Sequence, residues 1–389
     1  MGAWGTAMVW WILAAVNLAC VLGIGGTLIW GDRRIGWLAD VPPAPRTGGP
    51  RISVIVAARN EERNIEAAAE SLLNLDYADY ELLVVDDRST DSTGAILDRL
   101  AGRDPRLKVI HLTELPPGWL GKNHALDVGA RQATGEFLLF TDADVVLDST
   151  ALRRAMAHVQ RTDADHLAVS PDPAMPSLLL ESLVVVFVHV FFVYIRPWKV
   201  DDPKSPAFIG VGAFNLLKRE VYTAVGTMRA IAMRPDDDVK LGKLIKRQGF
   251  RQRFLAGRGL VRVPWYGSFR EMMVGLEKNL FAGVDYSLAI SVLGTSFFLF
   301  VYLWPFVALA FLQGSAWWMS LAAACVLLWE ARRTARATGC SRWSVLLFPL
   351  AVVLFVFVQW RAITLTYVRG GIRWRDTHYS LAELRANKV

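Results

Sequence analysis

Residues 136–145 read EFLLFTDADV, an apolar strand pattern that ends in an Asp-x-Asp pair. Side chains two residues apart on an extended chain point the same way, so Asp142 and Asp144 can face one divalent cation. Mg²⁺ and Mn²⁺ take oxygen ligands and accept phosphate oxygens in the rest of the shell, which suits a nucleoside diphosphate. The pair predicts a Mg²⁺ or Mn²⁺ site at this strand end, with a solvated acidic turn as the alternative.

Three further strand patterns precede this one, and helical patterns separate them. Strands that alternate with helices predict an α/β domain whose mainly parallel sheet is covered on both faces. Ligands bind such sheets at the carboxyl ends of the strands, where the acidic pairs of this chain fall. The earlier strands are expected at Ile52–Ala57 (ISVIVA), Glu81–Val85 (ELLVV) and Leu107–Leu112. The helices are expected after the polar turn 59–62 in a stretch that ends near Leu75, at Ser92–Leu100 and at Lys122–Ala133.

Polar residues follow the other strands as well. Asp86-Asp87 ends the second strand, and a carboxylate there can accept from a base N–H or a ribose hydroxyl, although Asp91 nearby suits a helix cap. Arg59-Asn60-Glu61 follows the first strand and could close a nucleotide pocket. Lys122, in GWLGKN (118–123), enters a helix, so it and the backbone N–H groups could meet a diphosphate, without forming a Walker loop.

A third acidic group, Asp236-Asp237-Asp238, follows Pro235 and opens a helical pattern. Carboxylates at a helix N-terminus often serve only as caps. In a domain that already has a metal site, one of them could take the proton from an acceptor hydroxyl. That role is assigned to Asp238 or Asp237.

Membrane segments account for the apolar composition, which is 53% hydrophobic against 20% charged. Ala7–Trp30 is an uncharged run long enough to cross a bilayer, and Arg33 and Arg34 follow it. The positive-inside rule then places residue 33 onward in the cytoplasm. The net charge is +7, and many of the Arg residues lie beside apolar blocks. This placement indicates contact with an anionic membrane surface, and no nucleic-acid partner is expected. The expected organisation is an anchor at 1–34, a linker at 35–50, an α/β domain at 51–283, a membrane region at 284–370 and a tail at 371–389.

The C-terminal membrane region is expected to hold two to three spans, at Leu288–Leu312, Ala316–Trp329 and Trp343–Trp360, the last interrupted by Pro349. Basic residues after the second span indicate a cytoplasmic position. The third span either crosses the membrane, which leaves a basic tail outside, or forms a re-entrant or interfacial segment.

One more apolar block, Leu178–Ile195, lies inside the α/β region. The acidic motifs on either side of it are expected to share one compartment, so an odd number of membrane crossings between them is excluded. The block is therefore expected to be either an interfacial helix or a buried helix of the domain. Cys20, Cys325 and Cys340 are the three cysteines, and their spacing excludes a disulfide scaffold.

Taken in order, these motifs resemble the family 2 glycosyltransferases, which have the GT-A fold. The resemblance implies a nucleotide-sugar donor, most often UDP-linked, a divalent metal, and transfer with inversion by one in-line displacement. The chain lacks the Gln-x-x-Arg-Trp motif of processive polysaccharide synthases, and so looks more like the subgroup that acts on carotenoids and hopanoids. The matching stretches are VIVAARNEERNI (54–65), VVDDRSTDST (84–93), GKNHAL (121–126), TDADV (141–145) and DDVKLG (237–242).

The likeness also implies roles for individual residues. Asp142 and Asp144 would bind the metal, and the second member of the Asp237-Asp238 pair would be the base. Residues 210–215 (GVGAFN) would form a loop on the acceptor side. The predicted contacts of the nucleotide sugar are Ala57, Arg59, Glu61, Asp86, Asp87, Lys122 and Asp142.

The function expected from the sequence is transfer of a sugar to a hydroxyl or carboxyl of a membrane lipid. The enzyme would be a multi-pass protein of the inner cell membrane, with its catalytic domain in the cytoplasm. A processive polysaccharide synthase and an inactive scaffold that keeps the glycosyltransferase fold are the alternatives.

Overall fold

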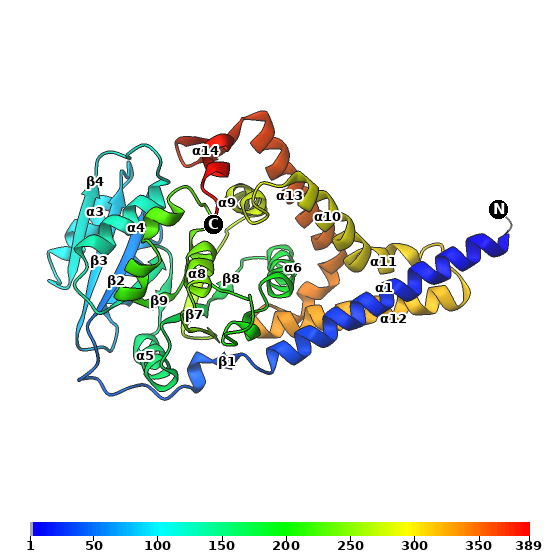
Figure 1. The fold of residues 1–389 in the computed structure, drawn as a ribbon, viewed down its shortest axis with the longest axis horizontal. Coiled ribbons are helices and arrows are strands. Elements are labelled where there is room, and N and C mark those ends of the chain that lie inside the picture. The colour runs from blue at the N-terminus through cyan, green and yellow to red at the C-terminus, as the bar shows by residue number, and fades with distance from the viewer. Residues whose placement is uncertain (1–2) are drawn as a thin grey trace. The chain divides into compact units, whose positions relative to one another are not determined.

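The computed structural model describes residues 3–389, with side-chain burial from residue 6 onward. The chain folds into two compact units, each assembled from separate stretches of sequence (Figure 1). The sheet unit consists of Ile35–Ala174, Ile195–Trp265 and Arg373–Val389. The helical unit consists of the N-terminal stretch to Arg34, Met175–Tyr194 and Tyr266–Ile372.

The described residues of the sheet unit form an eight-stranded sheet in the order β1-β10-β7-β9-β5-β2-β3-β4. All neighbouring strands are parallel except β9, which runs antiparallel to both β5 and β7. This mainly parallel arrangement confirms the predicted fold class. The strands are β1 (Gly36–Trp37), β2 (Ile52–Ala58), β3 (Tyr80–Asp87), β4 (Leu107–Leu112), β5 (Phe137–Asp142), β7 (His166–Ser170), β9 (Asn215–Lys218) and β10 (Gln252–Ala256).

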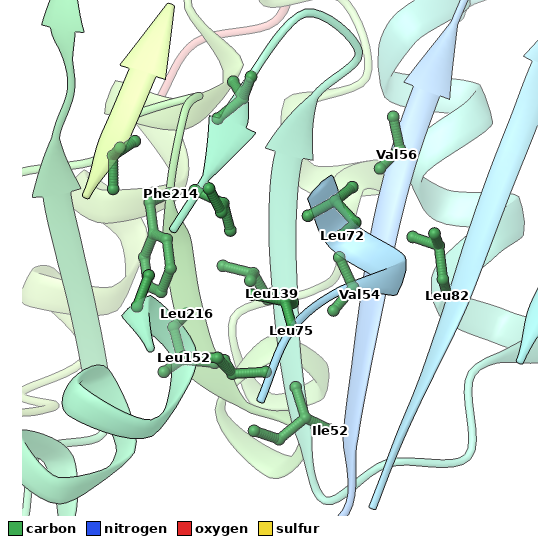
Figure 2. Packing of buried hydrophobic residues seen from close by; sticks show 14 of the residues in the cluster. Ile52, Val54, Val56, Leu72, Leu75, Leu82, Leu139, Leu152, Phe214 and Leu216 are labelled. Atoms are coloured by element: carbon green, nitrogen blue, oxygen red, sulfur yellow. The ribbon is translucent and has the colours of Figure 1, made fainter. Parts of the chain in front are cut away.

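Helices cover both faces of this sheet because successive side chains of each buried strand point to opposite faces. Ile52, Val54 and Val56 of β2 pack with Leu72 of one covering helix in a single cluster (Figure 2). Ile55, on the other face of β2, packs in a second cluster. The first cluster includes residues of α2 (Ile65–Leu73), α3 (Thr93–Ala101) and α5 (Ala151–Thr162), and the second includes residues of α4 (Gly121–Gln132), α7 (Arg219–Ala224) and α8 (Asp237–Arg247).

Smaller elements complete the sheet unit. A three-stranded sheet has the order β6-β11-β8, and a two-stranded sheet joins β12 to β13 close to the C-terminus. The short helix α14 follows β13. The bounds are β6 (Val146–Leu147), β8 (Asp172–Ala174), β11 (Val261–Pro264), β12 (Gly371–Trp374), β13 (Thr377–Ser380) and α14 (Leu381–Ala386).

The helical unit contains the long apolar helices. By length and composition, the segments Thr6–Asp32, Leu178–Lys199 and Arg342–Val368 could each cross a membrane. These three segments confirm that the predicted apolar blocks at the N-terminus, in mid-domain and near the C-terminus are helical. The helices are α1 (Ala3–Asp32), α6 (Leu178–Ile195), α9 (Phe269–Ala282), α10 (Leu288–Tyr302), α11 (Trp304–Ala308), α12 (Gly314–Ala337) and α13 (Phe348–Val368).

Helices α1 and α12 run side by side in the same direction (Figure 1). Near their C-terminal ends, Arg333 of α12 forms a 2.6 Å ion pair with Asp32 of α1. Near their N-terminal ends, Ala14 and Ala316 share one apolar cluster. The two helices therefore present their charged ends together.

Two prolines in the C-terminal region each lie in the first turn of a helix. The expected span Leu288–Leu312 is divided into α10 and α11, and Pro305 occupies the first turn of α11. Pro349, expected to interrupt a span, instead lies in the first turn of α13, where its missing N–H costs no helical hydrogen bond. The span that it was expected to break is continuous from Phe348 to Val368.

Candidate active site

The strand register brings the predicted site residues to one edge of the sheet. Ala57 of β2 is paired with Val85 of β3 on one side and with Asp142 of β5 on the other. Asp86 and Asp87 are the next residues of β3. Asp142 and the Asp86-Asp87 pair therefore lie at the carboxyl ends of β5 and β3, the two parallel strands on either side of β2, as the α/β pattern requires.

The loops that leave β2 and β3 are tied to each other. Asn60 has a left-handed backbone (φ 54°), and its N–H donates to Ser89 Oγ at 3.0 Å. In return, Asn60 Oδ1 accepts from the N–H of Thr90 at 2.8 Å. The backbone N–H of Glu61 donates to Thr93 Oγ1 at 2.8 Å. These bonds fix Glu61 beside the start of α3, so its position depends on both loops.

Asp86 and Asp87 are both buried, and each contacts different partners. Asp86 contacts His111 Nδ1 at 2.9 Å, and Asp87 contacts Arg88 Nε at 2.7 Å. Hydrogen bonds to Asp98 and Asp86 raise the pKa of His111. A second guanidinium, that of Arg59, lies 3.7 Å from Asp87. Sequence reasoning missed His111, because a lone histidine at the end of an edge strand carries no motif.

Lys122 bridges two of the acidic groups. Its Nζ lies 2.8 Å from Asp142 Oδ1 and 3.3 Å from Asp237 Oδ1. Burial alone would lower the pKa of Lys122, but the negative charges of Asp142, Asp237 and Asp238 outweigh it and raise that pKa well above its ordinary value. Lys122 is therefore a fixed positive charge at the point where β5 and α8 meet.

The start of α4 is anchored to the segment that precedes the acidic triplet. Asn123 Nδ2 donates to the carbonyl oxygens of Ile231, Ala232 and Arg234 at 2.8, 3.2 and 3.0 Å. Asn123 is completely buried. Because Asn123 follows Lys122 directly, these bonds hold the lysine in register with the triplet.

The structure gives each member of the Asp236-Asp237-Asp238 triplet a different environment. Asp236 forms a bidentate pair with the buried Arg234, at 2.9 and 3.1 Å. Asp237 faces Lys122. Asp238 Oδ2 accepts from the backbone N–H of Gly212 at 2.7 Å. Burial, together with the charge of Asp237, raises the pKa of Asp238 well above that of an ordinary aspartate.

Residues 210–215 pass between β5 and α8 at very close range. A Cβ on Gly210 would overlap the backbone oxygen of Asp238, and one on Gly242 would overlap that of Ile209. A Cβ on Gly212 would lie 2.7 Å from Asp142 Oδ2. Backbone atoms therefore leave room only for glycine at Gly210 of the loop and Gly242 of α8, whereas at Gly212 the neighbour is a side-chain oxygen. The backbone of the loop lies between Asp142 and Asp238.

Asp142 and Asp144 have the chemistry of a divalent-metal pair. Burial, followed by the charges of Asp142 and Glu61, raises the pKa of Asp144 well above its ordinary value. A divalent cation would relieve that repulsion, so these residues fit the metal that the sequence predicts. Within the described residues no three His, Cys, Asp or Glu side chains group closely enough to hold a metal ion.

A small pocket marks the point where these elements meet. It brings together Lys122 from α4, Asp142 from β5, Gly212 from the 210–215 loop, and Asp237 and Asp238 from α8. The other lining residues are Leu126, Phe140, Thr141, Asn215 and Met228. Of the predicted residues, Ala57, Arg59, Glu61, Asp86, Asp87 and Asp144 do not line this pocket.

Comparison with protein families matches residues 53–237 to the model described as Glycosyl transferase family 2. The match begins in β2 and ends at Asp237, so it includes both acidic pairs and Lys122.

Two curated relatives have names that refer to lipids. A beta-monoglucosyldiacylglycerol synthase from Synechocystis sp. is 33% identical over 163 residues, which are 40% of this chain and 31% of the relative. A 4,4'-diaponeurosporenoate glycosyltransferase from Staphylococcus haemolyticus is 25% identical over 239 residues, which are 60% of this chain and 62% of the relative. The chain thus spans under two thirds of the length of each.

Among solved structures, the mannosyltransferase PcManGT from Pyrobaculum calidifontis, in complex with GDP-Man and Mn²⁺, is similar in fold. The TM-score is 0.54 at 21% identity, and the match covers 92% of this chain and 99% of that one. The likeness supports the GT-A fold.

Proposed function

We propose a reaction for this chain, which carries a family 2 glycosyltransferase domain: it transfers a sugar from a UDP-linked donor to a membrane lipid, with inversion at the anomeric carbon. One observation carries the proposal. Lys122, Asp142, Asp237 and Asp238 converge on one pocket although they come from three different elements. A cation between two carboxylates, with a third carboxylate of raised pKa beside them, is an arrangement suited to a diphosphate leaving group and a proton acceptor.

The donor side of the site consists of the strand ends and the start of α4. The buried carboxylates of Asp86 and Asp87 accept from the base or the ribose, and Arg59 closes the pocket beside Asp87. Lys122 and the first N–H groups of α4 meet the diphosphate. Asp142 and Asp144 would hold a divalent cation, which neutralises the charge that develops on the leaving diphosphate.

The transfer step is a single displacement. An oxygen of the acceptor attacks the anomeric carbon and forms the new C–O bond, while the bond from that carbon to the diphosphate oxygen breaks and UDP leaves. Asp238 accepts the proton of an acceptor hydroxyl, a role favoured by its raised pKa. Lys122 stays protonated and faces the departing charge.

A lipid acceptor is supported by the apolar helical unit and by the names of the two relatives, one of which refers to a diacylglycerol lipid and the other to a carotenoid acid. The acceptor group would be a hydroxyl or a carboxyl on a membrane lipid, of which terpenoids such as carotenoids or hopanoids are the proposed class. A carboxylate acceptor would arrive deprotonated and would need no base.

The proposed topology follows from the stretches of chain that make up the sheet unit. A compact folded unit lies on one side of a membrane, and the residues on both flanks of α6 belong to this unit. Since α6 is the only helix between those flanks, it enters the membrane surface without crossing. This favours the interfacial alternative for Leu178–Ile195.

The same reasoning applies to the C-terminal helices. Residues 265 and 373 both belong to the sheet unit, so the stretch between them crosses the membrane an even number of times. Because α12 is parallel to α1, it crosses in the same direction as α1, and α10 with α11 crosses in the opposite direction. Helix α13 then begins and ends on the cytoplasmic side, and the tail stays with the sheet unit.

Cysteine labelling tests this topology in a chain whose three native cysteines have been replaced. A membrane-impermeant maleimide applied to intact cells should label Gln313→Cys, between α11 and α12, and should leave Ala386→Cys in α14 unlabelled. Labelling of Ala386→Cys from outside would contradict the proposed topology.

The reaction is tested with the full chain in nanodiscs, supplied with Mn²⁺, lipid extract and a panel of UDP-sugars. The expected result is UDP release that depends on the lipid, with a single sugar added to a lipid by mass spectrometry, and Asp238→Asn as the inactive control. A long polysaccharide product would point to a processive synthase instead. If the protein neither bound nor turned over any nucleotide sugar, the inactive scaffold would be the remaining interpretation.

A further inference from the structure

A hairpin follows helix α13, and from Arg373 onward it belongs to the sheet unit. Strands β12 and β13 are joined by Arg375 and Asp376, and Arg375 has a left-handed backbone (φ 53°). Residues from Arg373 to the C-terminus belong to the same compact unit as the eight-stranded sheet. The sequence pattern had identified this segment only as a basic tail.

Both residues of the hairpin turn pair with predicted donor-site residues. The guanidinium of Arg375 forms an ion pair with the carboxylate of Glu61. Asp376 Oδ2 accepts from Arg59 Nη2 at 3.1 Å. Arg59 and Glu61 both follow β2 and flank Asn60, so the turn binds this loop through two crossed charge pairs.

A third contact joins the hairpin to the start of α4. The hydroxyl of Tyr379 accepts from the backbone N–H of Gly121 at 3.3 Å, and Tyr379 is only 6% exposed. Gly121 is the first residue of α4, and the next residue is Lys122, which pairs with Asp142. The hairpin therefore touches both segments that are proposed to surround the diphosphate.

The rest of the tail holds the hairpin in place. Asn387 Oδ1 accepts from the N–H of Met233 at 3.0 Å, and Lys243 Nζ donates to the carbonyl of Val389 at 2.7 Å. A capping box between Ser380 and Glu383 begins α14. The tail is attached at both ends of α14, so the turn that carries Arg375 is positioned by defined contacts.

The charge of Arg375 matters because of its surroundings. Burial, and the negative charges of Asp142 and Asp91, raise the pKa of Glu61, and the opposing charge of Arg375 lowers it. Glu61 is thus within electrostatic reach of the Asp-x-Asp pair, and Arg375 brings a cation to that region. A guanidinium can bind two phosphate oxygens at once, with a planar geometry that lysine lacks.

We propose that the C-terminal hairpin is part of the donor-binding site and that Arg375 is a ligand of the donor diphosphate. In the free protein Glu61 holds the guanidinium in place, and the diphosphate takes over from Glu61 when the donor binds. Tyr379 positions the first N–H of α4 from the same hairpin. This inference rests on the proposed function, because it assumes a nucleoside diphosphate in the site.

The test is the affinity of the full-length protein for UDP and for uridine, measured by calorimetry with Mn²⁺. Arg375→Gln should weaken UDP binding at least about tenfold, the usual scale for a lost charge-assisted hydrogen bond. Uridine, which has no phosphate, should bind as before. Arg375→Lys should recover part of the UDP affinity, and Arg373→Gln, at an exposed position two residues earlier, should match the wild type.

The outcomes separate the two proposals. If the wild type binds UDP and Arg375→Gln binds it equally well, the hairpin is not part of the donor site and the proposed function still stands. If Arg375→Gln weakens uridine and UDP by the same factor, its effect is structural and the inference is wrong. If the wild-type protein does not bind UDP, the proposed function and this inference fail together.

Discussion

The backbone N–H of Gly212 donates a 2.7 Å hydrogen bond to Asp238 Oδ2, and this bond connects the 210–215 loop with the proposed base. On its other side, Gly212 has no room for a side chain, because a Cβ would lie 2.7 Å from Asp142 Oδ2. One glycine therefore sets the separation between the proposed metal ligand and the proposed base.

Gly212→Ala should reduce transfer while the fold is kept. The added methyl displaces the Asp142 carboxylate, and a displacement of about 1 Å at a reacting centre can cost on the order of a hundredfold in rate. The measurement is kcat by UDP release, with the melting temperature as a check on folding. Gly210→Ala is the contrasting variant: its Cβ would overlap the backbone of Asp238, so it should destabilise the protein. Normal turnover in Gly212→Ala would contradict the proposed geometry.

Two substitutions in the acidic triplet should affect different properties: that of Asp238 the rate of transfer, and that of Asp236 the stability of the fold. Asp238→Asn should reduce transfer to a lipid hydroxyl by about 10²- to 10⁴-fold, since general-base catalysis contributes on that scale, and UDP should still bind. Asp236→Asn should instead destabilise the fold by about 3–5 kcal/mol, because a bidentate ion pair with the buried Arg234 is broken.

Rates and chemical denaturation of the two triplet variants provide the check. If Asp236→Asn abolished transfer in a fully stable protein while Asp238→Asn remained active, the assignment of the base would be reversed. The two changes are matched in chemistry, since each replaces one carboxylate by an amide of the same shape.

The proposed metal pair predicts a specific response to Mn²⁺. Asp144→Asn removes a carboxylate whose pKa is raised by burial and by neighbouring charges, and so should lower the affinity for the cation. Transfer by the wild type should cease in EDTA and return with excess Mn²⁺, whereas Asp144→Asn should need far more Mn²⁺ for any activity. Unchanged activity of the wild type in EDTA would contradict metal dependence.

A buried histidine gives the sheet unit a pH-dependent stability. His166 lies between Asn215 Oδ1 and Gln252 Nε2, and burial lowers its pKa to about 4. The unfolded value is about 6.5. The contribution of neutral His166 to the free energy of unfolding is therefore fully present above pH 6.5. It is lost as the pH falls toward 4, because the unfolded chain binds the proton first.

Thermal unfolding between pH 7 and pH 4 measures this effect. His166→Gln should be less stable than the wild type at pH 7 and should show a weaker loss of stability on acidification. His158, whose pKa is also lowered to about 4 by burial, accounts for part of the remaining slope. An unchanged slope in His166→Gln would show that the imidazole does not control it.

The parallel part of the fold could be predicted because local patterns determine it. The run ISVIVA at 52–57 is buried on both faces, and β2 forms there with its acidic neighbours at the carboxyl edge. Strand β9 had no comparable signal: its four residues, Asn215–Lys218, form a strand through antiparallel pairing with β5 and β7, which are distant in sequence. Long-range pairing of this kind leaves little local signature.

The site was predicted in part for the same reason. Residues at strand ends, such as Asp142, follow from the α/β pattern, and the structure brings Asp142 to Lys122 and Asp237. The contacts of Asp237 with Lys122, of Asp238 with Gly212 and of Arg375 with Glu61 join residues distant in sequence, so spacing along the chain could not distinguish the members of the triplet or reveal the hairpin.

The position of the C-terminal hairpin has a consequence for how the protein is made. Arg59 and Glu61 leave the ribosome early, but their partners Asp376 and Arg375 are translated only after α13. In the nascent chain, Arg59 and Glu61 therefore lack these two partners until α13 has been synthesised. Completion of the proposed donor site is thereby linked to synthesis of the segments that precede the hairpin, and a product truncated after α13 would lack the hairpin.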